Sequence, residues 1–149
     1  MTTIILLSIA GAIISAVIGT VWYSNVTPMG RLHMRYLGFD KLSAAEQQAM
    51  MAQGKSMMPK LYAGQMLLSL LTAFATVFII TLSMQNGISF GMALGFVVLN
   101  WLCFVVPTIG GALLWGTCDR AIVWQKFFAD ILYSLVTLMV IAVVASLFV

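Results

Sequence analysis

Charged residues are scarce in this sequence, and their scarcity excludes most water-soluble folds. Only 7% of the 149 residues are Asp, Glu, Lys or Arg, whereas 62% are hydrophobic. A typical soluble domain carries about 25% charged residues, and a soluble fold of this size still exposes much of its surface to water. The apolar excess therefore has to face lipid.

Histidine and cysteine are also nearly absent, which excludes most metal centres and many catalytic motifs. The single histidine, His33, rules out a histidine cluster, and the two cysteines, Cys103 and Cys118, are predicted to be free thiols. No HExxH, GxSxG or phosphate-binding glycine loop occurs, and no nucleic-acid-binding motif occurs either. We therefore expect a protein that is not an enzyme and that uses no cofactor, metal or nucleic-acid partner.

The few charged residues are placed so that long stretches carry no charge at all. No Asp, Glu, Lys, Arg or His lies within residues 1–30, 61–118 or 131–149. A helix needs about 20 apolar residues to cross about 30 Å of hydrocarbon. The middle stretch is long enough for two spans joined at Gln85-Asn86-Gly87, a turn signal. The sequence therefore predicts an all-α integral membrane four-helix bundle that forms one domain, 1–149. The predicted spans are 4–22, 61–82, 88–115 and 127–149.

The basic residues predict how the bundle sits in the membrane. All seven Lys and Arg residues lie in the loops 23–60 and 116–126. Alternate loops lie on the same side of a membrane, and the positive-inside rule assigns these two to the cytoplasm. We therefore predict a multi-pass protein of the cell membrane with both termini outside the cytoplasm. Its predicted partner is the lipid bilayer, and the net charge of +3 suits anionic headgroups.

The first cytoplasmic loop is predicted to carry a short helix that begins at Thr27-Pro28. A threonine N-cap followed by proline starts a helix well, and Gly38 is a natural C-cap. Arg31 and Arg35 would lie on one face of this helix. If the helix lies in the membrane interface, these arginines contact lipid headgroups; packing of the helix under the bundle is the alternative.

A second short helix is predicted later in the same loop. Ser43 and Glu46 match the capping-box pattern, in which each side chain bonds the backbone N–H of the other's residue. This helix is expected to stop at Gly54. Methionines around it form a soft apolar surface that suits shallow membrane contact or, as the alternative, a protein partner.

Small residues recur at every fourth position in the first and third spans. Such spacing lets helix backbones approach closely, which drives helix association in lipid. Both spans would run from the outside inwards, so the first span is expected to pack on the third. A homo-oligomer formed through one of these faces is the alternative. The predicted helix-packing residues are Gly11, Ser15 and Gly19 in the first span and Gly87, Gly91 and Gly95 in the third.

Polar residues within the spans predict a polar interior, because polar groups in lipid turn inwards and seek partners. The candidates are Gln65, Asn100, Asp130 and Tyr133. Asp130 is the only acid in a predicted span, which indicates a proton or cation site. The structural alternative is that Asp130 stabilises the first turn of its helix through the helix dipole and pairs with Lys126.

Two segments carry a resemblance to a known family. Gly19-Thr20-Val21-Trp22-Tyr23-Ser24 ends the first span and is followed by Gly30-Arg31, and Trp101–Pro107 lies in the third. With these segments and the polar start of the last span, the chain resembles the membrane proteins that share the domain of unknown function numbered 1761. The resemblance covers essentially the full length and implies a four-helix membrane fold. It supplies no substrate and no catalytic residue.

Two classes of function therefore stay open on sequence grounds. The first is a small transporter or channel subunit that uses the polar interior, for a substrate or ion that the sequence does not identify. The second is a non-catalytic membrane interaction or assembly protein that uses the glycine faces and the methionine-rich loop.

Overall fold

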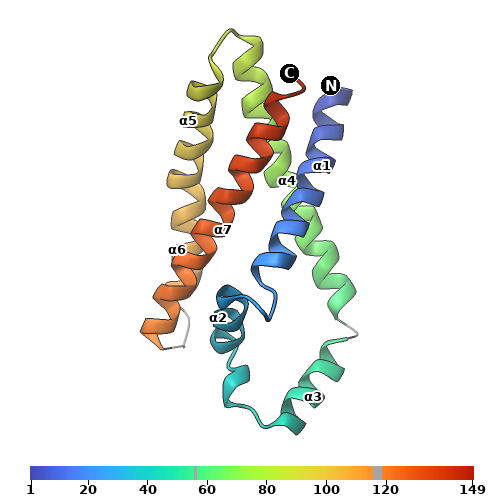
Figure 1. Ribbon diagram of the computed structural model, residues 1–149, viewed down its shortest axis with the longest axis vertical. Helices are drawn as coiled ribbons and strands as arrows, with labels where there is room; N and C mark the ends of the chain where they lie inside the picture. The colour runs from blue at the N-terminus through green and yellow to red at the C-terminus, as the bar shows by residue number, and fades with distance from the viewer. Residues whose placement is uncertain (56, 116–118) are drawn as a thin grey trace.

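The four predicted spans are present in the computed structural model, which describes residues 1–55, 57–115 and 119–149 (Figure 1). In this part of the chain, four helical stretches are long and apolar enough to cross a membrane. This confirms the predicted all-α, four-span architecture. The stretches are Thr2–Trp22 (α1), Met58–Gln85 (α4), Phe90–Leu113, which comprises several segments, and Arg120–Ser146 (α7).

The last span differs from its prediction because its helix begins earlier. α7 begins at Arg120, and the carboxylate of Asp119 caps it by accepting a 2.8 Å hydrogen bond from the N–H of Ala121. Asp130 therefore lies about three turns inside α7, and the prediction that it belongs to the first turn is wrong. The charges of Arg120 and Lys126 placed the predicted start too late, since the helix continues past both: Arg120 is exposed and Lys126 pairs with Asp130.

The third span is built from three successive segments. These are an α-helix, Phe90–Asn100 (α5), a π-helical stretch, Trp101–Val105 (η2), and a second α-helix, Val106–Leu114 (α6). Pro107 lies at the start of α6 and has no N–H to donate to the preceding turn, which accounts for the irregular hydrogen bonding before it. The indole N–H of Trp101 ties this stretch to α7, donating to the carbonyl oxygen of Ile131 at 3.1 Å and to Ser134 Oγ at 3.0 Å.

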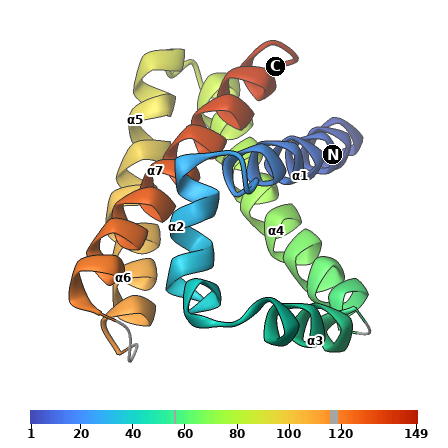
Figure 2. The same ribbon diagram turned by 60° about the horizontal axis from the view of Figure 1, so that its bottom comes forward.

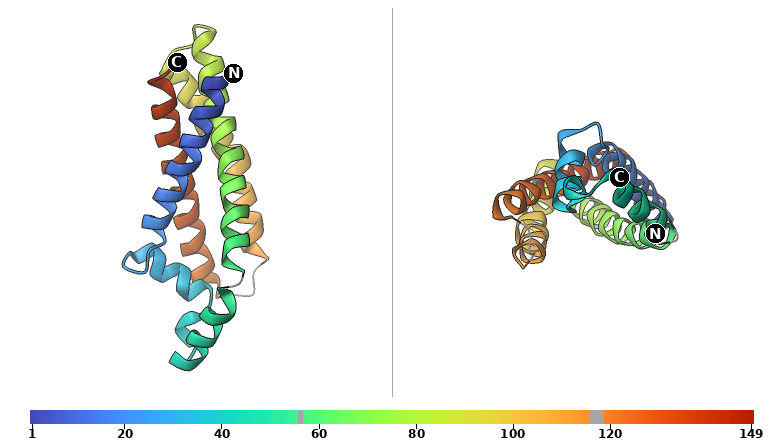
Figure 3. Two further views of the ribbon diagram at one scale, coloured as in Figure 1. Left: turned by 90° about the vertical axis from the view of Figure 1, so that its right-hand side faces the viewer. Right: turned by 90° about the horizontal axis from the view of Figure 1, so that it is seen from below.

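The two ends of the bundle differ sharply in charge. Both termini and the turn between α4 and α5 lie at one end, and α1 ends and α7 begins at the other (Figures 1 and 3). We call the second end the basic end, because it carries the Lys and Arg residues of both predicted cytoplasmic loops. The arrangement matches the alternation that the charge pattern predicts.

The core forms where α4, α5 and α7 pack together. Its most buried side chains include Ala73, Ile80, Ala93 and Ile141. α1 packs against this core through Ser8, Gly11, Ala12 and Ser15, all of which are buried. A Cβ atom added at Gly11 would lie 2.9 Å from Cβ of Ala73. The small residues of α1 therefore allow close contact, as predicted.

The partner of α1 is not the one predicted. α1 contacts α4 and α7, whereas α5 packs on α4 and α7 through Ala93 and Val97. Gly87 lies in the turn before α5 with a φ of 76°, so it is not a helix-packing residue. Added Cβ atoms at Gly91 and Gly95 would meet no atom within 4 Å in the part of the chain that the structure describes. The prediction that the first span packs on the third is therefore wrong. A small-residue stripe marks a helix as able to pack closely but does not specify its partner.

The loop at the basic end contains the two predicted short helices, Pro28–Tyr36 (α2) and Ala44–Gly54 (α3), and a 3₁₀ turn, Phe39–Lys41 (η1), between them (Figure 2). Thr27 Oγ1 caps α2 by accepting from the N–H of Gly30 at 3.0 Å. The capping box of α3 is confirmed, since Ser43 and Glu46 bond each other's backbone N–H groups. α2 packs on α7, so the structure agrees with the alternative of packing against the bundle.

Candidate functional site

An ion pair on α7 is the centre of the candidate site. The Lys126 ammonium group donates to both carboxylate oxygens of Asp130, one turn further along the helix. The two side chains are only 7% and 17% exposed. A charge held this far from water requires a partner, and among the described residues this is the one ion pair that the chain forms.

Tyr23 brings the end of α1 to this ion pair. Its hydroxyl donates to Asp130 Oδ1 at 2.5 Å, and Lys126 Nζ lies 5.1 Å from the centre of its ring. Tyr36 of α2 adds a second ring 5.8 Å from the same ammonium group. Burial and the neighbouring carboxylate of Asp130 raise the pKa of Tyr23 well above its usual range. Tyr23 therefore keeps its proton and acts as a donor.

His33 lies beside the ion pair on α2. Its ring centre is 5.3 Å from that of Tyr23, and its Nδ1 is buried without a partner among the described residues. Burial lowers the pKa of His33, the positive charge of Lys126 lowers it further, and the charge of Asp130 acts in the opposite direction. The imidazole is therefore neutral near pH 7 and carries no positive charge that would compensate Asp130.

Tyr133 links this cluster to the interior of the bundle. Its ring centre lies 5.4 Å from that of Tyr23, and its hydroxyl donates to the carbonyl oxygen of Ser15 at 3.1 Å. Ser15 Oγ donates to Ser69 Oγ at 3.3 Å, and Gln65 Nε2 donates to the same oxygen at 3.5 Å. A row of polar side chains thus crosses from α7 through α1 to α4. We call Tyr23, His33, Tyr36, Lys126, Asp130 and Tyr133 the basic-end cluster.

Gly19 has a different role from the one its spacing predicts. A Cβ atom added there would lie 2.9 Å from the hydroxyl oxygen of Tyr133. The missing side chain therefore leaves room for this tyrosine, which lies on α7. Packing at Gly19 and the geometry of the candidate site are coupled for this reason.

The predicted polar interior is only partly assembled. Asp130 and Tyr133 meet in the basic-end cluster, whereas Gln65 is an exposed residue that reaches the row through Ser69. Asn100 is exposed and lies apart, in a groove of about 290 Å³ between α4, α5 and α7, which Thr72 and Thr76 also line. The structure therefore does not place Gln65, Asn100 and Asp130 around one cavity.

Sequence reasoning missed Tyr23, His33 and Tyr36 as members of the site. Tyr23 had the signature of an aromatic residue at the membrane surface, and His33 showed no nearby acidic partner in the sequence. The signal that existed was the Trp-Tyr element directly after the first span, followed by a capped helix only a few residues later. The packing of α1 on α7 brings Tyr23 to Asp130, and the packing of α2 on α7 brings His33 and Tyr36 to the same place.

The site offers no set of metal ligands in the part of the chain that the structure describes. No group of three or more His, Cys, Asp or Glu side chains gathers there. Cys103 is an exposed free thiol, and Cys118 lies outside the described residues. The reactive group of the cluster is therefore the carboxylate of Asp130, whose charge Lys126 balances.

The family comparison agrees with this fold. The family described as "Protein of unknown function (DUF1761)" matches residues 6–146. The chain belongs to this family. No curated protein and no solved structure matches the chain. For this DUF1761 member, the geometry of the site is thus the basis for a functional proposal.

Proposed function

We propose that this DUF1761 protein is a small, non-enzymatic transporter or channel subunit in which Asp130 carries a proton or a small cation. The observation that carries the proposal is that the Asp130 side chain, only 17% exposed and about three turns into α7, contacts Lys126 and Tyr23. The dipole explanation does not account for this carboxylate, because Asp119 caps the helix. Buried charges in membrane helices are expensive and mark ion or proton pathways.

The neighbours of Asp130 suit an exchange of counterions. When a proton binds the carboxylate, the ion pair breaks and Lys126 keeps its charge. The rings of Tyr23 and Tyr36 already lie within cation–π distance of its ammonium group. They would hold that charge while Asp130 is neutral, which lowers the cost of separating the pair.

The row of polar side chains supports a path into the bundle. The hydroxyl groups of Tyr133, Ser15 and Ser69 follow one another across three helices, and the amide of Gln65 donates to the last of them. Hydroxyl groups both donate and accept hydrogen bonds, so these three are able to pass a proton between neighbours. In the proposal, this row connects the basic end with the middle of α4.

The proposal includes the predicted topology, with the basic end in the cytoplasm of the cell membrane. The clustering of the basic residues at one end supports it. A fluorescent protein that matures only in the cytoplasm, fused after Val149, is expected to stay dark. The same reporter inserted between Gly38 and Phe39 should fluoresce, and the reverse pattern would refute the orientation.

Replacing Asp130 with asparagine should reduce ion flux by about 10–100-fold. Contacts with a charged group contribute about 1.5–3 kcal/mol, and each 1.36 kcal/mol of barrier is a factor of ten in rate. Flux is measured in liposomes that contain the purified protein and a pH-sensitive or cation-sensitive dye. Gradients of H⁺, Na⁺ and K⁺ are imposed in turn.

The matched control for this experiment is Asp119→Asn. This change removes the same charge at the same end of α7, and asparagine caps helices as well as aspartate does. The control should transport like the wild type. Wild-type vesicles that are no leakier than protein-free vesicles for all three ions would refute the transport proposal.

The second candidate function is that of a membrane assembly protein, and the exposed face of α5 favours it. The third span buries only 11% of its most apolar stretch, against 39% for α4, and Gly91 and Gly95 face open space. Changing both glycines to leucine discriminates between the two functions. Assembly would be favoured if the Gly91→Leu/Gly95→Leu variant lost its oligomer while its monomer stayed folded, and if Asp130→Asn left the flux unchanged.

A further inference from the structure

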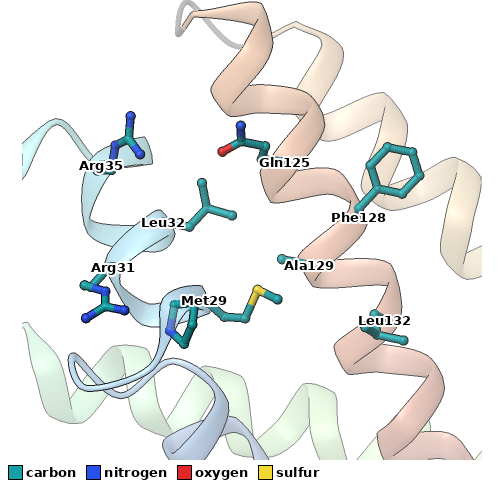
Figure 4. Close-up of a pocket in the computed structure, with 9 residues that line it drawn as sticks. Met29, Arg31, Leu32, Arg35, Gln125, Phe128, Ala129 and Leu132 are labelled. Atoms are coloured by element: carbon teal, nitrogen blue, oxygen red, sulfur yellow. The ribbon is translucent and has the colours of Figure 1, made fainter.

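A pocket at the basic end separates α2 from the first turns of α7 (Figure 4). Its volume is about 570 Å³, within the range of sites for small molecules. Met29 and Leu32 extend from α2 towards α7, where Ala129 lies opposite them, whereas the ring of Phe128 points away from α2. The pocket does not include Asp130, so it is distinct from the basic-end cluster.

Along α7, the lining of the pocket changes from polar to apolar. Arg35 of α2 and Gln125 of α7 lie towards the start of α7, and Leu132 lies two turns further along the helix (Figure 4). Arg31 lies one turn before Arg35 on α2, level with Ala129 and Leu132 of α7, and both arginines extend from the side of α2 that faces away from α7 (Figure 4). Phe128 and Leu132 are 60% and 46% exposed, so the apolar end of the pocket opens towards the surrounding lipid. This order matches a molecule with an anionic head and an apolar tail.

The two arginines have no acidic partner that would compete for them. Among the residues that the structure describes, the one ion pair is Lys126–Asp130, and both Arg31 and Arg35 are exposed. A guanidinium group binds phosphate through two parallel hydrogen bonds, and an amide such as Gln125 adds a further donor. Phosphate is therefore the ligand chemistry that this end of the pocket fits.

The position of α2 is fixed by local structure, so the backbone that carries the two arginines is in place before a ligand binds. Thr27 caps the helix, and Gly30 packs directly on the backbone of Ser24 in the preceding turn. A rigid wall reduces the ordering cost of binding. α2 is thus suited to hold one molecule in a defined position against α7.

We propose that the pocket between α2 and α7 binds one anionic phospholipid, with its phosphate at Arg35 and Gln125, the positive charge of Arg31 one turn away on α2, and an acyl chain along Met29 and Leu132. The site differs from the general layer of lipid around the helices because it has two walls and a defined headgroup position. The proposal does not depend on ion transport, since Asp130 lies outside the pocket.

Native mass spectrometry of the detergent-solubilised protein tests the proposal with phosphatidylglycerol and phosphatidylcholine of equal chain length. The wild type should retain one phosphatidylglycerol at least about tenfold more tightly than phosphatidylcholine, which is about 1.4 kcal/mol. The double variant Arg31→Gln/Arg35→Gln should lose this preference. Because both arginines are exposed, the variant should fold, which circular dichroism verifies.

The matched control is Lys41→Gln/Lys55→Gln, which removes the same charge from exposed residues of the same loop outside the pocket. It should keep the preference for phosphatidylglycerol. The single variant Gln125→Leu should weaken it by a smaller factor. Glycerol phosphate, which has the headgroup chemistry without acyl chains, should displace the lipid only at far higher concentration.

Three outcomes would overturn the proposal. The first is equal retention of the two lipids by the wild type, which would indicate ordinary boundary lipid. The second is an unchanged preference in the double arginine variant. The third is binding of glycerol phosphate as tight as that of the lipid, which would indicate a site for a soluble phosphate compound.

Discussion

Replacing Lys126 with methionine is expected to destabilise the bundle by about 3 kcal/mol, because it leaves the carboxylate of Asp130 without its counterion. Breaking a buried ion pair on one side typically costs about 3–5 kcal/mol. The lower end applies here, since Asp130 is 17% exposed and keeps the Tyr23 hydroxyl as a donor. Methionine resembles the lysine stem in length and flexibility, so little packing is lost.

The double variant Lys126→Met/Asp130→Asn should recover most of the stability that Lys126→Met loses. It contains no unpaired charge, and the asparagine oxygen still accepts a hydrogen bond from Tyr23. Stability is measured as the free energy of unfolding in detergent micelles. Lys60→Met, a change at an exposed lysine at the start of α4, serves as the control and should be nearly neutral. If Lys126→Met alone left the free energy of unfolding unchanged, the ion pair would not stabilise the bundle.

Replacing Gly30 with alanine is expected to detach α2 from α7. An added Cβ atom would overlap the carbonyl oxygen of Ser24 and lie 2.7 Å from that of Tyr23. Both are backbone atoms, so the clash is relieved only if α2 moves. Overpacking typically costs about 1–3 kcal/mol, and the upper end of this range is expected here.

Hydrogen exchange of the α2 amides measures this detachment directly. In Gly30→Ala, the amides of Arg31–Tyr36 should exchange faster, while those in the core of α4 should be little changed. Gly64→Ala is the matched control, because an added Cβ atom there meets nothing within 4 Å. Protection of α2 equal to that of the wild type would show that the turn after α1 adapts without moving the helix.

The spans and the loop helices could be predicted from the sequence because local features encode them. Long charge-free stretches of sufficient length are helices in lipid, where every backbone group must be satisfied within its own segment. Thr27 and Ser43 supply the caps of α2 and α3 through atoms only a few residues away. The exception was the start of α7, where charged residues continue the helix beyond the apolar stretch.

The candidate site was predicted less well, since its members come from elements far apart in the chain. Asp130 and Tyr133 share one face of α7 and could be grouped from spacing. Asn100 appeared equally suited, but its groove lies on another side of the bundle. Tyr23 joins the site because α1 packs on α7, where Gly19 also leaves space for Tyr133.

The sequence by itself determined that this chain is a four-span helical protein with one basic end, because hydropathy, charge and capping act over short distances. The tertiary structure decided that α1 packs on α4 and α7, that Tyr23 donates to Asp130, and that a pocket lies between α2 and α7. The physical reason is that apolar helices in lipid associate through shape. Shape complementarity between two helices depends on where their surfaces meet in space, and the spacing of small residues along one helix does not specify it.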